Sequence, residues 1–246
     1  MRRRDIFFAT LVVLAAWQLG AWLLAEPILP GPILVMRTFV SELGNGLLGH
    51  FAASLGRVTA SIILAVALAA PAGVILGQSK SLNRLFSPLI YILYPIPKVV
   101  FVPVVLLLFG IGNFPKIFLI FIILFFQILV LVRDQAAGLR GELIQSVRSL
   151  GAGRRALFRY VYFPASLPAI LTALRQSVGT AVAVLYIAEL FATQRGLGYY
   201  ISLNGTTLFN YPAMYAGVVA MSILGLGLYF TVDRLDYWLC RWKYIS

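Results

Sequence analysis

The sequence predicts an all-α integral membrane protein with six transmembrane helices, organised as a single domain over residues 1–246. Of these residues 61% are hydrophobic and only 11% are charged, which is more apolar surface than a soluble core of this size needs. Six apolar runs are long enough to cross ~30 Å of hydrocarbon as helices. The basic residues behind the net charge of +12 lie at the ends of those runs rather than in one patch. That distribution favours membrane lipids over nucleic acid as their partner.

The first two predicted spans cover residues 6–25 and 55–77. The first follows the basic opening MRRRD and has no small-residue cleavage site, so it is interpreted as an uncleaved signal anchor. A proline-rich turn and a short amphipathic helix over residues 33–43 separate the two spans. The second span has small residues at steps of four, the pattern of a closely packed helix face. They are Ser61, Ala65, Ala69, Gly73 and Gly77.

The remaining spans are predicted over residues 88–109, 115–132, 165–191 and 212–235. In the first of these, three prolines interrupt the apolar run around Lys98: Pro95, Pro97 and Pro103. The span at 165–191 repeats the small-residue pattern with Ala165, Ala169, Ala173, Ser177 and Ala181. Both termini, the loop after the second span and the excursion between the fourth and fifth spans are rich in Lys and Arg. The positive-inside rule therefore predicts cytoplasmic termini.

The excursion over residues 142–164 is predicted to form a helix–turn–helix elbow in water. Both halves have an apolar stripe and a polar face at helical spacing. Between them lies Leu150-Gly151-Ala152-Gly153, where Gly151 is expected to take backbone angles that other residues adopt only at a cost. Pro164 is predicted to end the second helix, because it lacks a backbone donor. The alternative is an amphipathic hairpin that lies on the membrane surface.

At these residues the chain resembles the permease subunits of binding-protein-dependent ABC importers. Their signature is Glu-Ala-Ala, three residues, Gly, nine residues and Ile-x-Leu-Pro. Gly151 fits, and Val161, Phe163 and Pro164 follow at the expected spacing. Gln145 begins the segment at the Glu-Ala-Ala places, so a salt bridge from that position to a partner is lost while a hydrogen bond stays available.

Residues 94–117, ILPGP near the start and the late stretch AELF…GLGYYI resemble the nitrate, sulfonate and taurine group of these permeases. The resemblance implies the type I ABC importer fold in a bacterial plasma (inner) membrane. The implied partners are a second permease copy, an extracytoplasmic binding protein and a cytoplasmic ATPase dimer that binds ATP and Mg. No cofactor is expected in this chain. The implied substrate is a small solute, anionic in character, such as a sulfonate, nitrate, taurine or a related organic acid.

The resemblance assigns ATPase coupling to the elbow: Gly151 supplies the turn, a tip follows it, and the first helix braces both. The residues concerned are Gln145, Arg148, Leu150, Gly151, Ala152, Gly153, Arg154, Arg155 and Pro164.

Five further residues are candidates for the translocation path: Pro95, Pro97, Lys98, Pro103 and Glu189. Prolines inside a span free backbone carbonyls, which are tolerated where protein or a watery cavity accepts them, but they also serve as plain kinks. Lys98 either attracts an anionic substrate or extends toward an interface. Glu189 is either functional or one half of a structural pair, for example with Arg195. His50 is expected to be a solvated loop residue.

The sequence has no GxxxxGK[ST] phosphate-binding loop, a single cysteine at Cys240, no metal-ligand cluster and no nucleophile–base constellation. The chain is therefore predicted not to be an enzyme. Two rival functions remain. One is an ion-coupled secondary transporter, which would favour carboxylates at mid-membrane positions. The other is a structural or lipid-binding scaffold.

Overall fold

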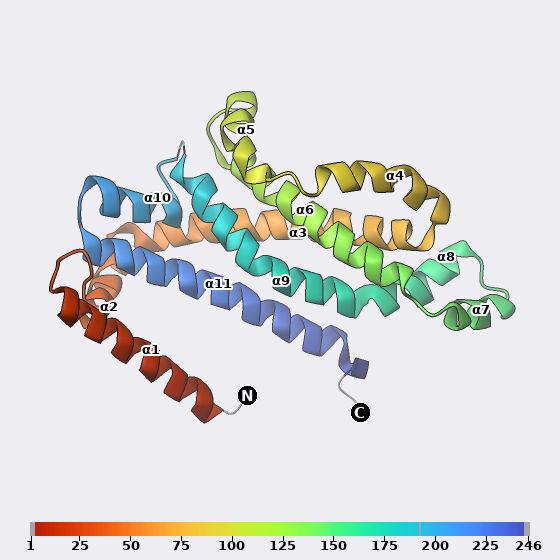
Figure 1. Cartoon of the computed structure of the whole chain (residues 1–246), viewed down its shortest axis with the longest axis horizontal. Helices are drawn as coiled ribbons and strands as arrows, with labels where there is room; N and C mark the ends of the chain where they lie inside the picture. Colours follow the sequence, from red (N-terminus) through yellow and green to blue (C-terminus); the bar gives the residue numbers. More distant parts are fainter. Residues whose placement is uncertain (1–2, 192, 244–246) are drawn as a thin grey trace. The chain divides into compact units, whose positions relative to one another are not determined.

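The computed structural model describes residues 3–191 and 193–243, and every regular element in these ranges is a helix (Figure 1). The predicted all-α class is confirmed. The helices in chain order are α1 (Arg3–Leu24), α2 (Pro32–Glu42), α3 (Leu48–Gln78), α4 (Lys80–Leu93), α5 (Val102–Phe109), α6 (Asn113–Ala137), α7 (Gly141–Ser149), α8 (Arg154–Leu157), α9 (Phe163–Leu190), α10 (Leu197–Ser202) and α11 (Tyr211–Leu239). Short π-helical turns join three pairs of them: η1 (Leu43–Leu47), η3 (Phe158–Tyr162) and η4 (Leu203–Thr207).

Within the described residues, five helices are long and apolar enough to cross a membrane. They are Phe7–Leu24, Pro32–Gln78, Asn113–Ala137, Arg154–Leu190 and Tyr211–Leu239. A sixth span results if Lys80–Leu93 and Lys98–Phe109, which are bent by 73°, are counted together. The helix at Pro32–Gln78 contains both the predicted amphipathic helix and the second span. They meet at a kink where Gly46 has a φ of +112°.

The predicted span over residues 88–109 is two helices rather than one interrupted helix (Figure 1). α4 begins eight residues earlier than the prediction, at Lys80, because the Ser79 hydroxyl caps it by accepting the Leu82 N–H at 3.4 Å. It ends at Leu93: the Tyr94 N–H still donates to the Ile90 carbonyl at 2.8 Å, and Pro95 and Pro97, which have no backbone donor, then interrupt the helix. Pro103 lies in the first turn of α5, where a missing N–H costs nothing. It therefore starts a helix, and the predicted interruption at Pro103 is wrong.

The chain divides into two compact units, each with its own interior. The first unit contains Met1–Leu55 and Glu189–Leu224, and the second contains Gly56–Ala188 and Gly225–Ser246. In the first unit, the Trp17 indole donates to the Pro30 carbonyl at 3.1 Å and its ring lies 5.9 Å from that of Tyr215. The Tyr200 hydroxyl also donates to Glu42 at 2.9 Å. Within the first unit, these contacts hold α1 to the loop before α2 and to α11, and they hold α10 to α2.

The small-residue face of α3 is a seam against α6 in the second unit. Ser61, Ala65 and Ala69 are completely buried, and the Ser61 hydroxyl lies 3.1 Å from the Ile117 carbonyl. A Cβ added at Gly73 would lie 2.9 Å from the Val132 Cβ. The helices therefore approach closely enough that a methyl group is already too large, as the sequence pattern predicts.

Candidate functional site

The elbow consists of α7 and α8 with Leu150–Gly153 between them (Figure 1). The Gly151 N–H donates to the Arg148 carbonyl at 2.9 Å, and Gly151 has a φ of +85°. The predicted special backbone of Gly151 is thus confirmed. A Cβ added there would meet no atom within 4 Å, so glycine is needed for its backbone freedom rather than for space.

The tip of the elbow presents an apolar side chain among cations. Leu150 is 85% exposed, and Arg148, Arg154 and Arg155 around it are exposed as well. On the other side, Leu157 and Val161 are buried and anchor the second half in the body of the second unit. This combination of an exposed leucine and basic residues on a fixed turn makes the tip a candidate surface for a protein partner.

Pro164 does not end the second helix, which runs without a break from Arg154 to Leu190. The π-helical turn η3 precedes the proline, and the Phe163 N–H donates to the Phe158 carbonyl across this widened turn. The wider turn relieves the ring of Pro164 from the clash that it would cause in a regular helix. The prediction that Pro164 terminates the helix is therefore wrong, and the elbow is continuous with α9.

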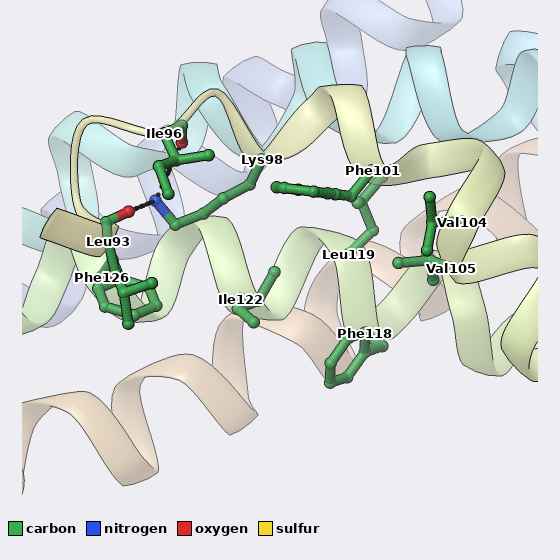
Figure 2. Close-up of a pocket in the computed structure, with 10 residues that line it drawn as sticks. All are labelled: Leu93, Ile96, Lys98, Phe101, Val104, Val105, Phe118, Leu119, Ile122 and Phe126. Atoms are coloured by element: carbon green, nitrogen blue, oxygen red, sulfur yellow. Dashed lines mark hydrogen bonds between the residues drawn. The ribbon is translucent and has the colours of Figure 1, made fainter. Parts of the chain in front are cut away.

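Lys98 closes the end of α4 (Figure 2). Its ammonium group donates to the carbonyls of Leu93 at 2.8 Å, Tyr94 at 3.0 Å and Ile96 at 3.2 Å, and lies 4.6 Å from the centre of the Phe126 ring. An ammonium group has three donors, and all three meet carbonyls left by the break between α4 and α5. The cavity of about 340 Å³ beside it is otherwise apolar. This geometry fits a structural cap of α4 and leaves no donor of Lys98 pointed at a solute. Pro95 and Pro97 form the break itself.

Glu189 is completely buried in the first unit, where it ties α3 to α10. The Ser54 hydroxyl lies 2.9 and 2.8 Å from its two carboxylate oxygens, and the Gly198 N–H donates to one of them at 2.9 Å. The Leu197 N–H in turn donates to the Ser54 hydroxyl at 2.8 Å. Gly196, at φ +133°, passes so close that an added Cβ would lie 2.4 Å from the Glu189 Cδ. The GLGYYI stretch is thus the start of α10, and its first turn brings the Gly198 N–H to a buried carboxylate and the Leu197 N–H to the Ser54 hydroxyl.

His50 belongs to the same unit and lies in α3, half-buried. Its Nδ1 lies 3.1 Å from the Gly196 N–H, and its ring is 5.3 Å from the Tyr200 ring and 6.0 Å from the Tyr199 ring. The expectation of a solvated loop residue is wrong, because the loop at Gly196 folds back over the start of α3. Sequence spacing carries no signal for this contact.

A charge cluster in the second unit links α9 to α11. Arg175 pairs with Asp236, which is completely buried, and with Asp233 at 3.3 Å. Lys243 lies 3.6 Å from Asp236. The sequence contained a signal for this cluster. A cation inside an apolar run, such as Arg175, needs carboxylates as partners. Asp233 and Asp236, three residues apart near the end of the last span, lie on one face of a helix. Among the described residues no group of three or more His, Cys, Asp and Glu side chains could hold a metal ion.

Several apolar spanning helices and a basic, apolar-tipped elbow define a multi-pass membrane permease subunit. The family model described as "Binding-protein-dependent transport system inner membrane component" matches residues 69–243. The chain belongs to this family and is the permease subunit of an ABC importer.

Relatives and a solved structure agree with that assignment. A probable ABC transporter permease protein of Brucella abortus is 34% identical over 230 residues, which cover 92% of each chain. The taurine transport system permease protein TauC of Escherichia coli is 30% identical over 250 residues, which cover 96% of this chain and 90% of TauC. An inward-facing structure of the MetNI methionine ABC transporter shares the fold, with a TM-score of 0.70 at 21% identity over 80% of this chain and 97% of that one.

Proposed function

We propose that the chain is one half of an import pore for a small anionic solute, paired with a second copy of itself. A cytoplasmic ATPase dimer docks on the elbow, binds ATP and Mg, and supplies the energy. An extracytoplasmic binding protein delivers the solute. The observation that carries this proposal is the exposed Leu150 within its basic rim, placed on a turn that Gly151 fixes.

The continuous helix from Arg154 to Leu190 gives the elbow a mechanical role. When the ATPase dimer closes around ATP, the two elbows are drawn together. Because α8, η3 and α9 are one helix, this movement tilts a membrane-spanning element instead of bending a loop. Hydrolysis then releases the elbows and resets the pore. Gln145 and Arg148 on α7 brace the turn, and Ala152, Gly153, Arg154 and Arg155 form the docking tip.

We infer that the solute is taurine or a related sulfonate. The taurine transport permease, 30% identical over 96% of this chain, and a putative aliphatic sulfonates transport permease, 28% identical over 94% of it, support this class. The sulfonate group stays negatively charged at all physiological pH values, so the group to be recognised does not change with the external pH; in taurine an ammonium group balances this charge.

The experiment is uptake of labelled taurine into proteoliposomes that contain the permease with its ATPase and binding protein. We expect uptake only when ATP is present on the side of the membrane where the ATPase is bound. A proton or sodium ionophore should not change the rate of uptake. Uptake that continues without ATP and stops with the ionophore would instead establish an ion-coupled secondary transporter. ATP-dependent uptake of another anion in preference to taurine would refute the substrate assignment alone.

The orientation is tested separately. With the termini in the cytoplasm, a cysteine introduced at Ser41 should react with an impermeant reagent in intact cells. One at Ser149 should react only after permeabilisation, with the buried Cys240 as the unreactive background. Labelling of the cysteine at position 149 in intact cells would show that the topology is inverted and that the elbow is on the opposite side of the membrane from the ATPase.

A further inference from the structure

We propose that the second unit binds an anionic phospholipid, with its headgroup beside the elbow and an acyl chain between α3, α4 and α6. This goes beyond the proposed transport function and does not depend on the identity of the solute. Only the leaflet, the cytoplasmic one, rests on the orientation proposed above.

The headgroup site is a cavity of about 660 Å³ bounded by the end of α3, the start of α4 and the elbow. Three cations line it, one from the start of α4 and one from each arm of the elbow: Lys80, Arg148 and Arg154. The rest of its polar lining is uncharged and consists of Gln78, Ser79, Ser81 and Tyr162. No described carboxylate lines the cavity. The positive end of the α4 helix dipole adds to the same field. The cavity is therefore suited to a phosphate group.

An apolar groove of about 450 Å³ adjoins this cavity, and Ile75 and Leu82 line both. It continues between α3, α4 and α6, where Phe86, Leu89, Phe125 and Leu129 line it. All of these residues lie in one compact unit, so the two cavities have a fixed relation.

The combination of a basic cavity with an adjoining apolar groove selects the occupant. A free phosphate would use the cations and leave the groove empty. A zwitterionic lipid such as phosphatidylcholine would fill the groove, but its headgroup would bring a further positive charge to the three cations together with its phosphate. A diacyl phospholipid with a net negative headgroup satisfies both, and basic pockets at the cytoplasmic ends of membrane helices favour such headgroups.

The bound lipid would affect the elbow directly. Lys80 belongs to α4, whereas Arg148 and Arg154 belong to the two arms of the elbow. Without an anion these like charges repel across the cavity, and a phosphate between them converts repulsion into attraction. An anionic lipid should therefore hold the elbow against the start of α4.

The test is lipid binding to the purified full-length permease with its ATPase, measured by native mass spectrometry. Phosphatidylglycerol and phosphatidylcholine with the same acyl chains are compared, and inorganic phosphate is offered in a third arm. Lys80→Gln is the test variant, because Lys80 lies outside the elbow. Arg84→Gln is the matched control, because Arg84 is an exposed cation one turn further along α4 that does not line the cavity.

We expect phosphatidylglycerol to bind in preference to phosphatidylcholine, and Lys80→Gln to weaken it about fivefold, the effect of about 1 kcal/mol for one basic residue near an anionic headgroup. Arg84→Gln should change it less than twofold. Ala72→Phe, which fills the groove, should weaken both lipids. Inorganic phosphate at millimolar concentration should not displace the lipid.

Equal binding of the two lipids, or equal effects of Lys80→Gln and Arg84→Gln, would overturn the proposal. Displacement by inorganic phosphate would show a free-anion site instead. Loss of the ATPase from Lys80→Gln with unchanged lipid binding would assign the cavity to the protein interface. Because the readout is bound lipid, a failure of taurine transport leaves this test intact.

Discussion

Replacement of Gly151 by alanine separates the role of the turn from that of its surface. At a φ of +85° an L-residue is strained by about 1–2 kcal/mol, whereas no atom lies within 4 Å of the added Cβ. The penalty therefore falls on the turn alone. If it is released by opening of the turn, the ratio of closed, docking-competent elbows to open ones falls about 5- to 30-fold, since 1.4 kcal/mol is about tenfold in an equilibrium constant.

Gly153 provides the matched control two residues away. Its φ of −76° and ψ of 175° are extended angles that alanine adopts without strain, and an added Cβ there also meets no atom within 4 Å. Gly153→Ala should therefore keep the backbone of the elbow intact, and because Gly153 belongs to the docking tip it controls for the effect of an added methyl group on docking. The assay is co-purification of the ATPase with the permease, together with ATP-dependent uptake in proteoliposomes. Insertion and thermal stability of the permease should stay at wild-type levels in both variants, because the helices pack elsewhere.

The expected pattern is a loss of ATPase binding, or of uptake per ATP hydrolysed, in Gly151→Ala but not in Gly153→Ala. Equal behaviour of the two variants would show that the strained turn is not what couples the permease to its ATPase. Coupling would then have to be assigned to another cytoplasmic segment.

Three further substitutions follow from the structure. Gly73→Leu should lower the thermal unfolding temperature in detergent by an amount equivalent to about 1–3 kcal/mol, because a Cβ added at this position already lies 2.9 Å from the Val132 Cβ. Wild-type stability of this variant would disprove the seam between α3 and α6. Lys98→Met should cost about 1 kcal/mol of stability through the lost carbonyl contacts while the salt dependence of uptake is unchanged. Full stability with weakened uptake would make Lys98 a solute-binding residue. Gly196→Ala places an L-residue at a left-handed φ and brings its Cβ to 2.4 Å from the Glu189 Cδ. We therefore expect at least about 2 kcal/mol of destabilisation and faster proteolysis before α10. Wild-type resistance to proteolysis would show that the loop adapts to the added methyl group.

The all-α class and the α3–α6 seam could be predicted because they depend on local patterns. Apolar runs of sufficient length have few alternatives to a spanning helix, and the step of four from Ser61 to Gly77 already places its members on one face. The turn at Gly151 was predictable for the same reason: the residue type reports the backbone angle that the position needs.

Contacts that depend on where helices end could not be predicted in this way. The role of Lys98 follows from the end of α4 at Leu93, where the segment with Pro95 and Pro97 breaks the predicted span. Pro164 was misjudged because the rule for proline assumes a regular helix, and η3 is not one. The contact between His50 and Gly196 joins segments 146 residues apart, a separation at which sequence pattern carries no information.

Under the proposed coupling to an ATPase, the unbroken helix from Arg154 to Leu190 would set the scale of the transmitted movement. At a rise of about 1.5 Å per residue, its 37 residues form a rod about 55 Å long. A rod of this length that pivots about one end by about 10° carries its other end through about 10 Å, which is the width of a helix. Small angular changes at the elbow end of the helix would therefore be large displacements at the opposite end. The stiffness of the π-helical turn at Phe158–Tyr162 would then decide how much of this displacement is lost to bending of the helix.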